Sequence, residues 1–173
     1  RLEPENEADA VVRAYRDVPG DVPLVVVGDA PYAADYIVRL RASADARVIF
    51  PGAIYGEGYR QLLCNAGVYV QATEVGGTHP ALVEAMGYGR VICYNATPEN
   101  EEVAGGAALP FEASRPETLT TLLRTVLDDP LRHRAAGQQR RAPQGAVGRA
   151  PHRRVAQPVP QRREREGDVQ RSR

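Results

Sequence analysis

Short runs of β-branched residues alternate with helical segments along residues 1–137, and this alternation constrains the fold more than any other feature. The run VPLVVVGD (residues 22–29) is continuously apolar until it stops at Gly-Asp, as expected for a strand that is buried on both faces. Helical spacing precedes it in residues 8–18 and follows it in residues 32–43. Strands that alternate with helices in this way predict βαβ crossovers. We therefore expect an α/β, Rossmann-like parallel sheet with helices on both faces.

The same pattern continues through the rest of this region. Further strands are expected at residues 46–52, 67–73, 90–95 and 106–111, with helices at 57–66, from about Thr78, and at 115–129. Ligands of such sheets bind at the carboxyl ends of the strands. The predicted ends are rich in glycine, which lets backbone N–H groups approach a ligand closely. These ends are Gly28-Asp29, Pro51 to Tyr55, Thr73 to Thr78, and the segment from Asn95.

The stretch EVGGTHPALVEAMGYG (residues 74–89) lies on this predicted rim. Thr78 suits a helix N-cap, and Pro80 suits the first turn of the helix. Unpaired N–H groups at the helix start, together with the helix dipole, favour the binding of an anion such as phosphate.

Inside that helix, Leu82, Ala85 and Met86 form an apolar stripe that faces the sheet, so Glu84 is turned away from the core. A carboxylate in that position accepts two hydroxyl hydrogen bonds at once, as a ribose diol requires. The alternative is an ordinary surface glutamate. The residues alone favour neither interpretation.

Residues 138–173 differ in kind from the rest of the chain. They contain no Leu, Ile, Phe, Tyr or Met, and their ten arginines against three acidic residues give them a charge of +7 in a chain of zero net charge. Such a segment cannot bury enough apolar surface to offset the entropy of ordering it, so we expect a disordered tail. The tail has two alternative explanations. One is a translated frameshift in GC-rich DNA, which the abrupt change in composition favours. The other is an arginine-rich tether for anionic partners.

Other features narrow the class of protein. The sequence has no apolar run near the roughly 20 residues of a membrane span and no signal peptide, so we expect a cytoplasmic protein, at most at the inner face of the membrane. The cysteines and histidines lack metal-ligand spacing, so no metal site is expected. These residues are Cys64, Cys93, His79, His133 and His152.

Three segments resemble the donor-binding half of family-4 retaining glycosyltransferases with the GT-B fold. They are similar to the bacterial polysaccharide subgroup that includes rhamnosyltransferases. The subgroup's GGT-x-P-x-L-x-E-A helix start matches Gly76 to Ala85, its N-x-E-V segment matches Asn100 to Val103, and its opening R-x-x-PEN matches Arg1 to Asn6. The likeness covers nearly all of residues 1–138 and implies a nucleotide-sugar-binding domain over residues 1–137.

The resemblance implies two catalytic residues. Arg1 matches the arginine that grips the donor diphosphate, and Glu84 matches the glutamate that binds the ribose hydroxyls. Ile54 matches the segment whose backbone meets the nucleotide base. The remaining expected contacts are to the diphosphate and the sugar. They involve the helix-start residues Gly76, Gly77, Thr78 and His79, and two residues on the rim, Asn100 and Glu102.

The implied activity is retaining transfer of a sugar from a nucleoside-diphosphate donor, with rhamnose suggested by the subgroup. An arginine and fixed N–H groups would stabilise the charge on the leaving group, without a metal or another cofactor. The expected partners are this donor and a glycan or lipid-linked acceptor, and no nucleic acid. The acceptor would be held by the other GT-B half, which lies outside this sequence, so we expect the fragment alone to have little or no activity.

The sequence departs from the wider superfamily at two points. Gly76 replaces the usual first glutamate, while Glu74 lies two residues out of register, and the lysine usual near Asn6 is absent. Three other interpretations stay open. They are a sugar-nucleotide epimerase, a non-catalytic flavodoxin-like nucleotide-binding domain, and a degenerate gene product.

Overall fold

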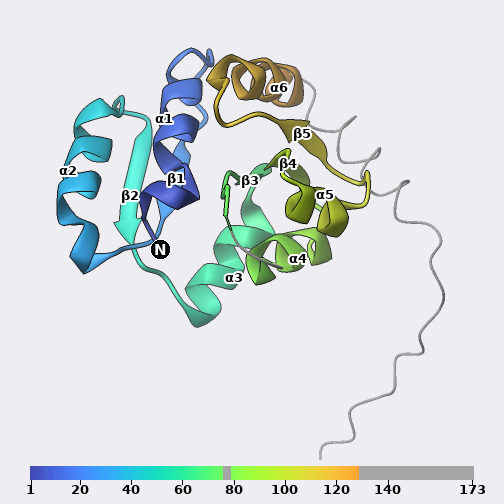
Figure 1. Cartoon of the computed structure of the whole chain (residues 1–173), viewed down its shortest axis with the longest axis horizontal. Coiled ribbons are helices and arrows are strands. Elements are labelled where there is room, and N and C mark those ends of the chain that lie inside the picture. The colour runs from blue at the N-terminus through green and yellow to red at the C-terminus, as the bar shows by residue number, and fades with distance from the viewer. Residues whose placement is uncertain (76–78, 129–173) are drawn as a thin grey trace, which may run out of the picture. The chain divides into compact units, whose positions relative to one another are not determined.

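The computed structural model describes residues 1–75 and 79–128 (Figure 1). The predicted tail at residues 138–173 lies outside the described part, as do Gly76, Gly77 and Thr78. Within the described part, strands and helices alternate as the sequence predicts. In chain order they are α1 (Ala8–Arg16), β1 (Leu24–Val27), α2 (Ala34–Ser43), β2 (Val48–Gly52), α3 (Gly56–Asn65), β3 (Val68–Gln71), α4 (Pro80–Gly87), β4 (Val91–Asn95), α5 (Pro98–Ala104), β5 (Leu109–Phe111) and α6 (Pro116–Asp128).

The short helix α5 was not predicted, although the sequence carries a signal for it. The Thr97 hydroxyl accepts a hydrogen bond from the Asn100 N–H at 3.3 Å, and Pro98 occupies the first turn. Gly105 ends the helix in the left-handed conformation, with φ 54°. A threonine N-cap followed by proline and closed by glycine is a complete set of helix boundary signals.

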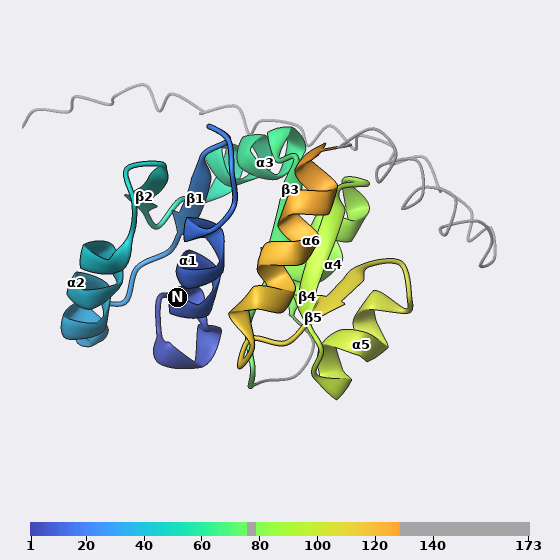
Figure 2. The ribbon, with the colours of Figure 1, turned by 90° about the horizontal axis from the view of Figure 1, so that it is seen from above.

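The described strands form two parallel sheets where the alternation predicted one. β1 pairs with β2, and β4 lies between β3 and β5 in the second sheet. In both views β1 and β3 are the inner strands that face each other (Figure 2). All five residues of β4 are buried, whereas Val25 in β1 remains 37% exposed. The expectation that VPLVVVGD is buried on both faces is therefore wrong: none of the four residues of β1 is fully buried, and among the described residues only β2 pairs with this strand.

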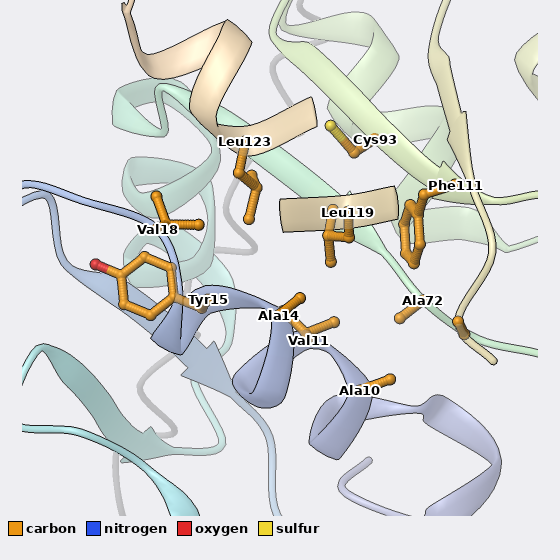
Figure 3. Close-up of a cluster of buried hydrophobic side chains, with 11 residues drawn as sticks. Ala10, Val11, Ala14, Tyr15, Val18, Ala72, Cys93, Phe111, Leu119 and Leu123 are labelled. Atoms are coloured by element: carbon orange, nitrogen blue, oxygen red, sulfur yellow. The ribbon is translucent and has the colours of Figure 1, made fainter. Parts of the chain in front are cut away.

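Helices cover both faces of the three-stranded sheet, as predicted. On one face, side chains of α1 and α6 pack against the sheet, with Leu119 at the centre near Cys93 and Phe111 (Figure 3). On the other face, Ile92 and Tyr94 pack with α3, α4 and α5. Cys93 and its two neighbours point to opposite faces because side chains alternate along a strand.

Candidate functional site

The opening loop, residues 1–7, lies against the carboxyl end of β1. A Cβ atom placed on Gly28, just after this strand, would lie 3.2 Å from Leu2 Cγ and 3.5 Å from the carbonyl carbon of Arg1. Gly28 also has φ +147°, a conformation that side-chain-bearing residues rarely adopt. Glycine is therefore required here both for its backbone angle and for the close approach of the loop.

The same loop is also bonded to the carboxyl end of β3. The Thr73 hydroxyl donates to Asn6 Oδ1 at 3.2 Å, and the Glu74 N–H donates to the Glu5 carbonyl at 3.0 Å. Asn6 Nδ2 in turn donates to the Arg1 carbonyl at 2.8 Å. The carboxyl ends of β1 and β3 therefore meet at one rim, which is where ligands of parallel α/β sheets bind.

Arg1 presents its guanidinium on this rim. Its side chain is 75% exposed, and Nη1 lies 3.7 Å from Glu3 Oε1. An exposed ion pair at that distance contributes little energy. The guanidinium is consequently available to an anionic ligand.

Helix α4 begins at the rim, one residue later than predicted. His79 is the N-cap and Pro80 occupies the first turn, which confirms the role of the proline. The His79 side chain makes no capping hydrogen bond, while its carbonyl accepts from the N–H groups of Leu82 at 3.0 Å and Val83 at 3.3 Å. The half-buried His79 also lines a cavity that Arg1 lines.

Glu84 is exposed on α4, while Leu82 and Ala85 are fully buried, as the apolar stripe predicts. Tyr59 of α3, which the sequence did not single out, lies near Glu84. Burial, followed by the nearby Glu84 carboxylate, raises the pKa of Tyr59 to about 12. The Glu84 side chain itself is exposed and accessible to a ligand. No signal in either segment alone shows that α3 and α4 meet in this way.

Asn100 does not lie on the rim as expected. Its side chain is fully buried, and Nδ2 donates to the carbonyls of Asn95 at 3.0 Å and Thr73 at 3.1 Å. It thereby joins the end of β4 to the end of β3. The physical reason is the start of α5 at Thr97, which turns the third residue of the helix inward, and Asn100 is consequently a positioning residue.

The last two predicted residues lie on α5 and in the loop after β2. Glu102 is exposed on α5. Ile54 follows β2 and is half-buried, with its Cγ2 atom 3.0 Å from the position of a Cβ on Gly58. The side chain of Ile54 therefore lies close to Gly58 on the first turn of α3.

Glu7 closes the opening loop in a strained and charged environment. It has φ 53°, the one positive φ among non-glycine residues in the described ranges. Partial burial and the neighbouring carboxylates of Asp9 and Glu74 raise the pKa of Glu7 above its usual value of 4.5. Both features disfavour glutamate at this position.

We expect Glu7→Gly to raise the free energy of unfolding by about 1 kcal/mol at pH values below about 4, because glycine adopts the left-handed conformation without strain, and by more at neutral pH, because it also removes the carboxylate. Glu7→Gln keeps the strain and removes the charge. Since the folded pKa is raised, the parent protein loses stability as pH rises from the unfolded to the folded pKa of Glu7. The advantage of Glu7→Gln should therefore be present at neutral pH and vanish below about pH 4. Urea titrations at several pH values test this, and a pH-independent advantage would contradict it.

The described residues contain no group of three or more His, Cys, Asp or Glu side chains placed to hold a metal ion. They also contain no helix with the length and apolar character needed to cross a membrane.

Parallel strands, helices on both faces and a polar rim at the carboxyl ends define a Rossmann-like α/β domain. The chain belongs to the glycosyl transferases group 1 family, whose family model matches residues 1–129. The predicted glycosyltransferase membership is thus confirmed. The rhamnosyltransferase-like subgroup stays a prediction. No match was found among curated proteins.

Solved glycosyltransferase structures share the fold. HepE from Anabaena in complex with UDP-glucose has a TM-score of 0.72 at 20% identity, over 79% of this chain and 40% of HepE. Sucrose-phosphate synthase from Thermosynechococcus elongatus has a TM-score of 0.67 at 21% identity, over 80% of this chain and 37% of that protein. The catalytic domain of a Helicobacter pylori cholesterol-α-glucosyltransferase has a TM-score of 0.67 at 17% identity, over 80% and 89% of the two chains. The chain therefore spans about 40% of the length of HepE.

Proposed function

We propose that this chain is the donor-binding half of a retaining glycosyltransferase and binds a nucleoside-diphosphate sugar at the rim. The observation that carries the proposal is the placement of the exposed Arg1 guanidinium at the meeting point of β1 and β3. An anion bound there would meet a weakly paired cation. HepE, which shares the fold, was solved with UDP and with UDP-glucose, and this supports a nucleotide-sugar ligand.

Each proposed contact follows from the chemistry of a side chain or of a backbone group. Arg1 would bind the diphosphate together with His79 and the N–H groups of Gly76, Gly77 and Thr78. The exposed Glu84 would accept hydrogen bonds from the ribose hydroxyls. We assign the base to the backbone at Ile54 and a sugar contact to the exposed Glu102.

Catalysis would rest on electrostatic stabilisation of the departing diphosphate. Negative charge develops on this group as its bond to the anomeric carbon breaks, and a fixed guanidinium close to it lowers the barrier. The proposed chemistry uses no metal ion or cofactor. Rhamnose is the proposed sugar, and a glycan or lipid-linked acceptor would be bound by the other half of the enzyme. We propose that this half alone is inactive in transfer.

Nucleotide binding is tested by thermal shift of the full chain with UDP, thymidine diphosphate, GDP and ADP. One of the four should raise the free energy of unfolding by about 2.7 kcal/mol at a hundredfold excess over its dissociation constant. Glu84→Gln removes one carboxylate charge and should abolish most of this stabilisation. Asp17→Asn is the matched control, because Asp17 is exposed at the opposite end of α1 from the opening loop. A folded chain indifferent to all four nucleotides would refute the proposal.

A further inference from the structure

Polar side chains follow one another along one face of β3. Side chains alternate along a strand, so Tyr69, Gln71 and Thr73, which comes just after the strand, share the face on which Tyr69 packs with α3 and α4. Gln71 is only 7% exposed. Burial of an amide costs free energy unless its hydrogen-bonding groups are paired. A glutamine at this position is therefore retained at a cost that its hydrogen bonds must offset.

Gln71 differs from the other buried polar side chains of the described part of the chain. The others bond to the backbone of another segment, as Asn100 does, and so join parts of the fold directly. The hydrogen bonds of Gln71 within the described part go to the side chains of Tyr69 and Thr73. Gln71 therefore acts by orienting its neighbours. The four buried polar side chains are Gln71, Asn95, Asn100 and Thr120.

The hydrogen bonds of this polar row, which comprises Tyr69, Gln71, Thr73 and Asn6, all run in one direction. The Tyr69 hydroxyl donates to Gln71 Oε1 at 2.8 Å, and Gln71 Nε2 donates to Thr73 Oγ1 at 2.9 Å. The Thr73 hydroxyl donates to Asn6 Oδ1, and Asn6 Nδ2 donates to the Arg1 carbonyl. Groups that each accept one bond and donate the next polarise one another, so the bonds of such a row strengthen each other.

The direction of the row decides how the Asn6 amide is oriented. A hydroxyl has one proton, and Thr73 gives it to Asn6 because Gln71 presents an N–H to the hydroxyl oxygen. A reversed Gln71 amide would take that proton instead. Asn6 would then turn its N–H toward Thr73 and its oxygen toward the Arg1 carbonyl, where two acceptors repel each other. The Tyr69 hydroxyl prevents this reversal by donating to Gln71 Oε1.

We propose that Tyr69, Gln71 and Thr73 are positioning residues for the diphosphate site. They fix the Asn6 amide, which holds the Arg1 backbone and thereby places the Arg1 guanidinium on the rim. The inference rests on the proposed function, because it takes Arg1 as the group that binds the diphosphate. A charged group binds its ligand best when hydrogen bonds behind it keep it in the productive geometry.

The experiment compares variants of the full chain by amide NMR spectroscopy. Thr73→Val keeps the shape of the side chain and removes the hydroxyl, and Gln71→Met removes the amide. Both should weaken the binding of inorganic pyrophosphate to the folded chain about five- to tenfold, the effect of one net hydrogen bond. Both should also speed the amide exchange of Glu74, whose N–H donates to the Glu5 carbonyl in the opening loop, at least about tenfold.

Two further variants serve as controls. Thr73→Ser retains a hydroxyl and should restore the affinity and the exchange rate of the parent. Thr121→Val should change neither, because the Thr121 hydroxyl bonds to the Glu117 carbonyl on an exposed part of α6. If Thr73→Val or Gln71→Met fails to fold, Tyr69→Phe replaces it. This variant removes only the first donor of the row and should shift both readouts in the same direction by a smaller factor.

Unchanged pyrophosphate affinity in the folded variants would overturn the proposal, even if their stability fell, because the row would then be structural only. An equal loss of affinity in Thr73→Ser would also overturn it. If the parent binds neither pyrophosphate nor any of the four nucleoside diphosphates, the proposed function is refuted instead. The Glu74 exchange rates then decide the inference by themselves, since equal rates in the parent and the variants would show that the row does not hold the opening loop.

Discussion

Asn100→Ala is expected to lower the free energy of unfolding by about 2–3 kcal/mol. The reason is that the Asn100 amide donates to the buried carbonyl of Asn95 at 3.0 Å and to the partly buried carbonyl of Thr73 at 3.1 Å. Alanine leaves both acceptors without this donor and removes the link between the ends of β3 and β4. Urea unfolding followed by circular dichroism measures the loss.

Asn65→Ala is the matched control for this change. Asn65 is exposed on α3, where its Nδ2 donates to the Gln61 carbonyl, so its loss should cost less than about 1 kcal/mol. The comparison also separates two roles for Asn100. A rim residue that touches the sugar would lose ligand binding with little loss of stability, and that outcome would contradict the positioning role.

Leu119→Ala is expected to cost about 3–5 kcal/mol, the largest effect of a single substitution considered for this chain. Leu119 has no exposed surface and lies between α1 and the three-stranded sheet, near Ala14 and Phe111 (Figure 3). The helices and strands that surround Leu119 cannot move fully into the space left by its side chain, so a cavity would remain.

The half-buried Leu122, on the same helix, is the control for this prediction. Leu122→Ala should cost about 1 kcal/mol, because solvent can fill much of the space that the side chain leaves. Thermal unfolding of the two variants beside the parent tests the difference. Equal losses at both positions would show that Leu119 is not at the centre of this core.

Local patterns predicted the order and type of nearly all described elements. The spacing of apolar residues predicted the buried Leu82 and Ala85 and the exposed Glu84, because a helix of known period places them without reference to other segments. Pro80 was placed correctly in the first turn of α4 for the same reason. The missed helix α5 also had local signals at Thr97 and Pro98.

Local patterns failed wherever the outcome depended on a distant partner. Asn100 was expected on the rim, yet the carbonyls of Thr73 and Asn95 draw its side chain into the interior. The proximity of Tyr59 and Glu84 depends on the packing of α3 beside α4. Neither contact can be predicted from the spacing of apolar residues within its own segment.

The sequence by itself therefore determined the α/β class, the alternation of elements and the family, because helix and strand periods and short motifs are properties of neighbouring residues. The tertiary structure decided that the carboxyl ends of β1 and β3 share a rim with Arg1, and that these strands face a common cavity. Those features arise from hydrogen bonds and packing between residues far apart in the chain. Their energies depend on distances and directions that only the folded backbone sets.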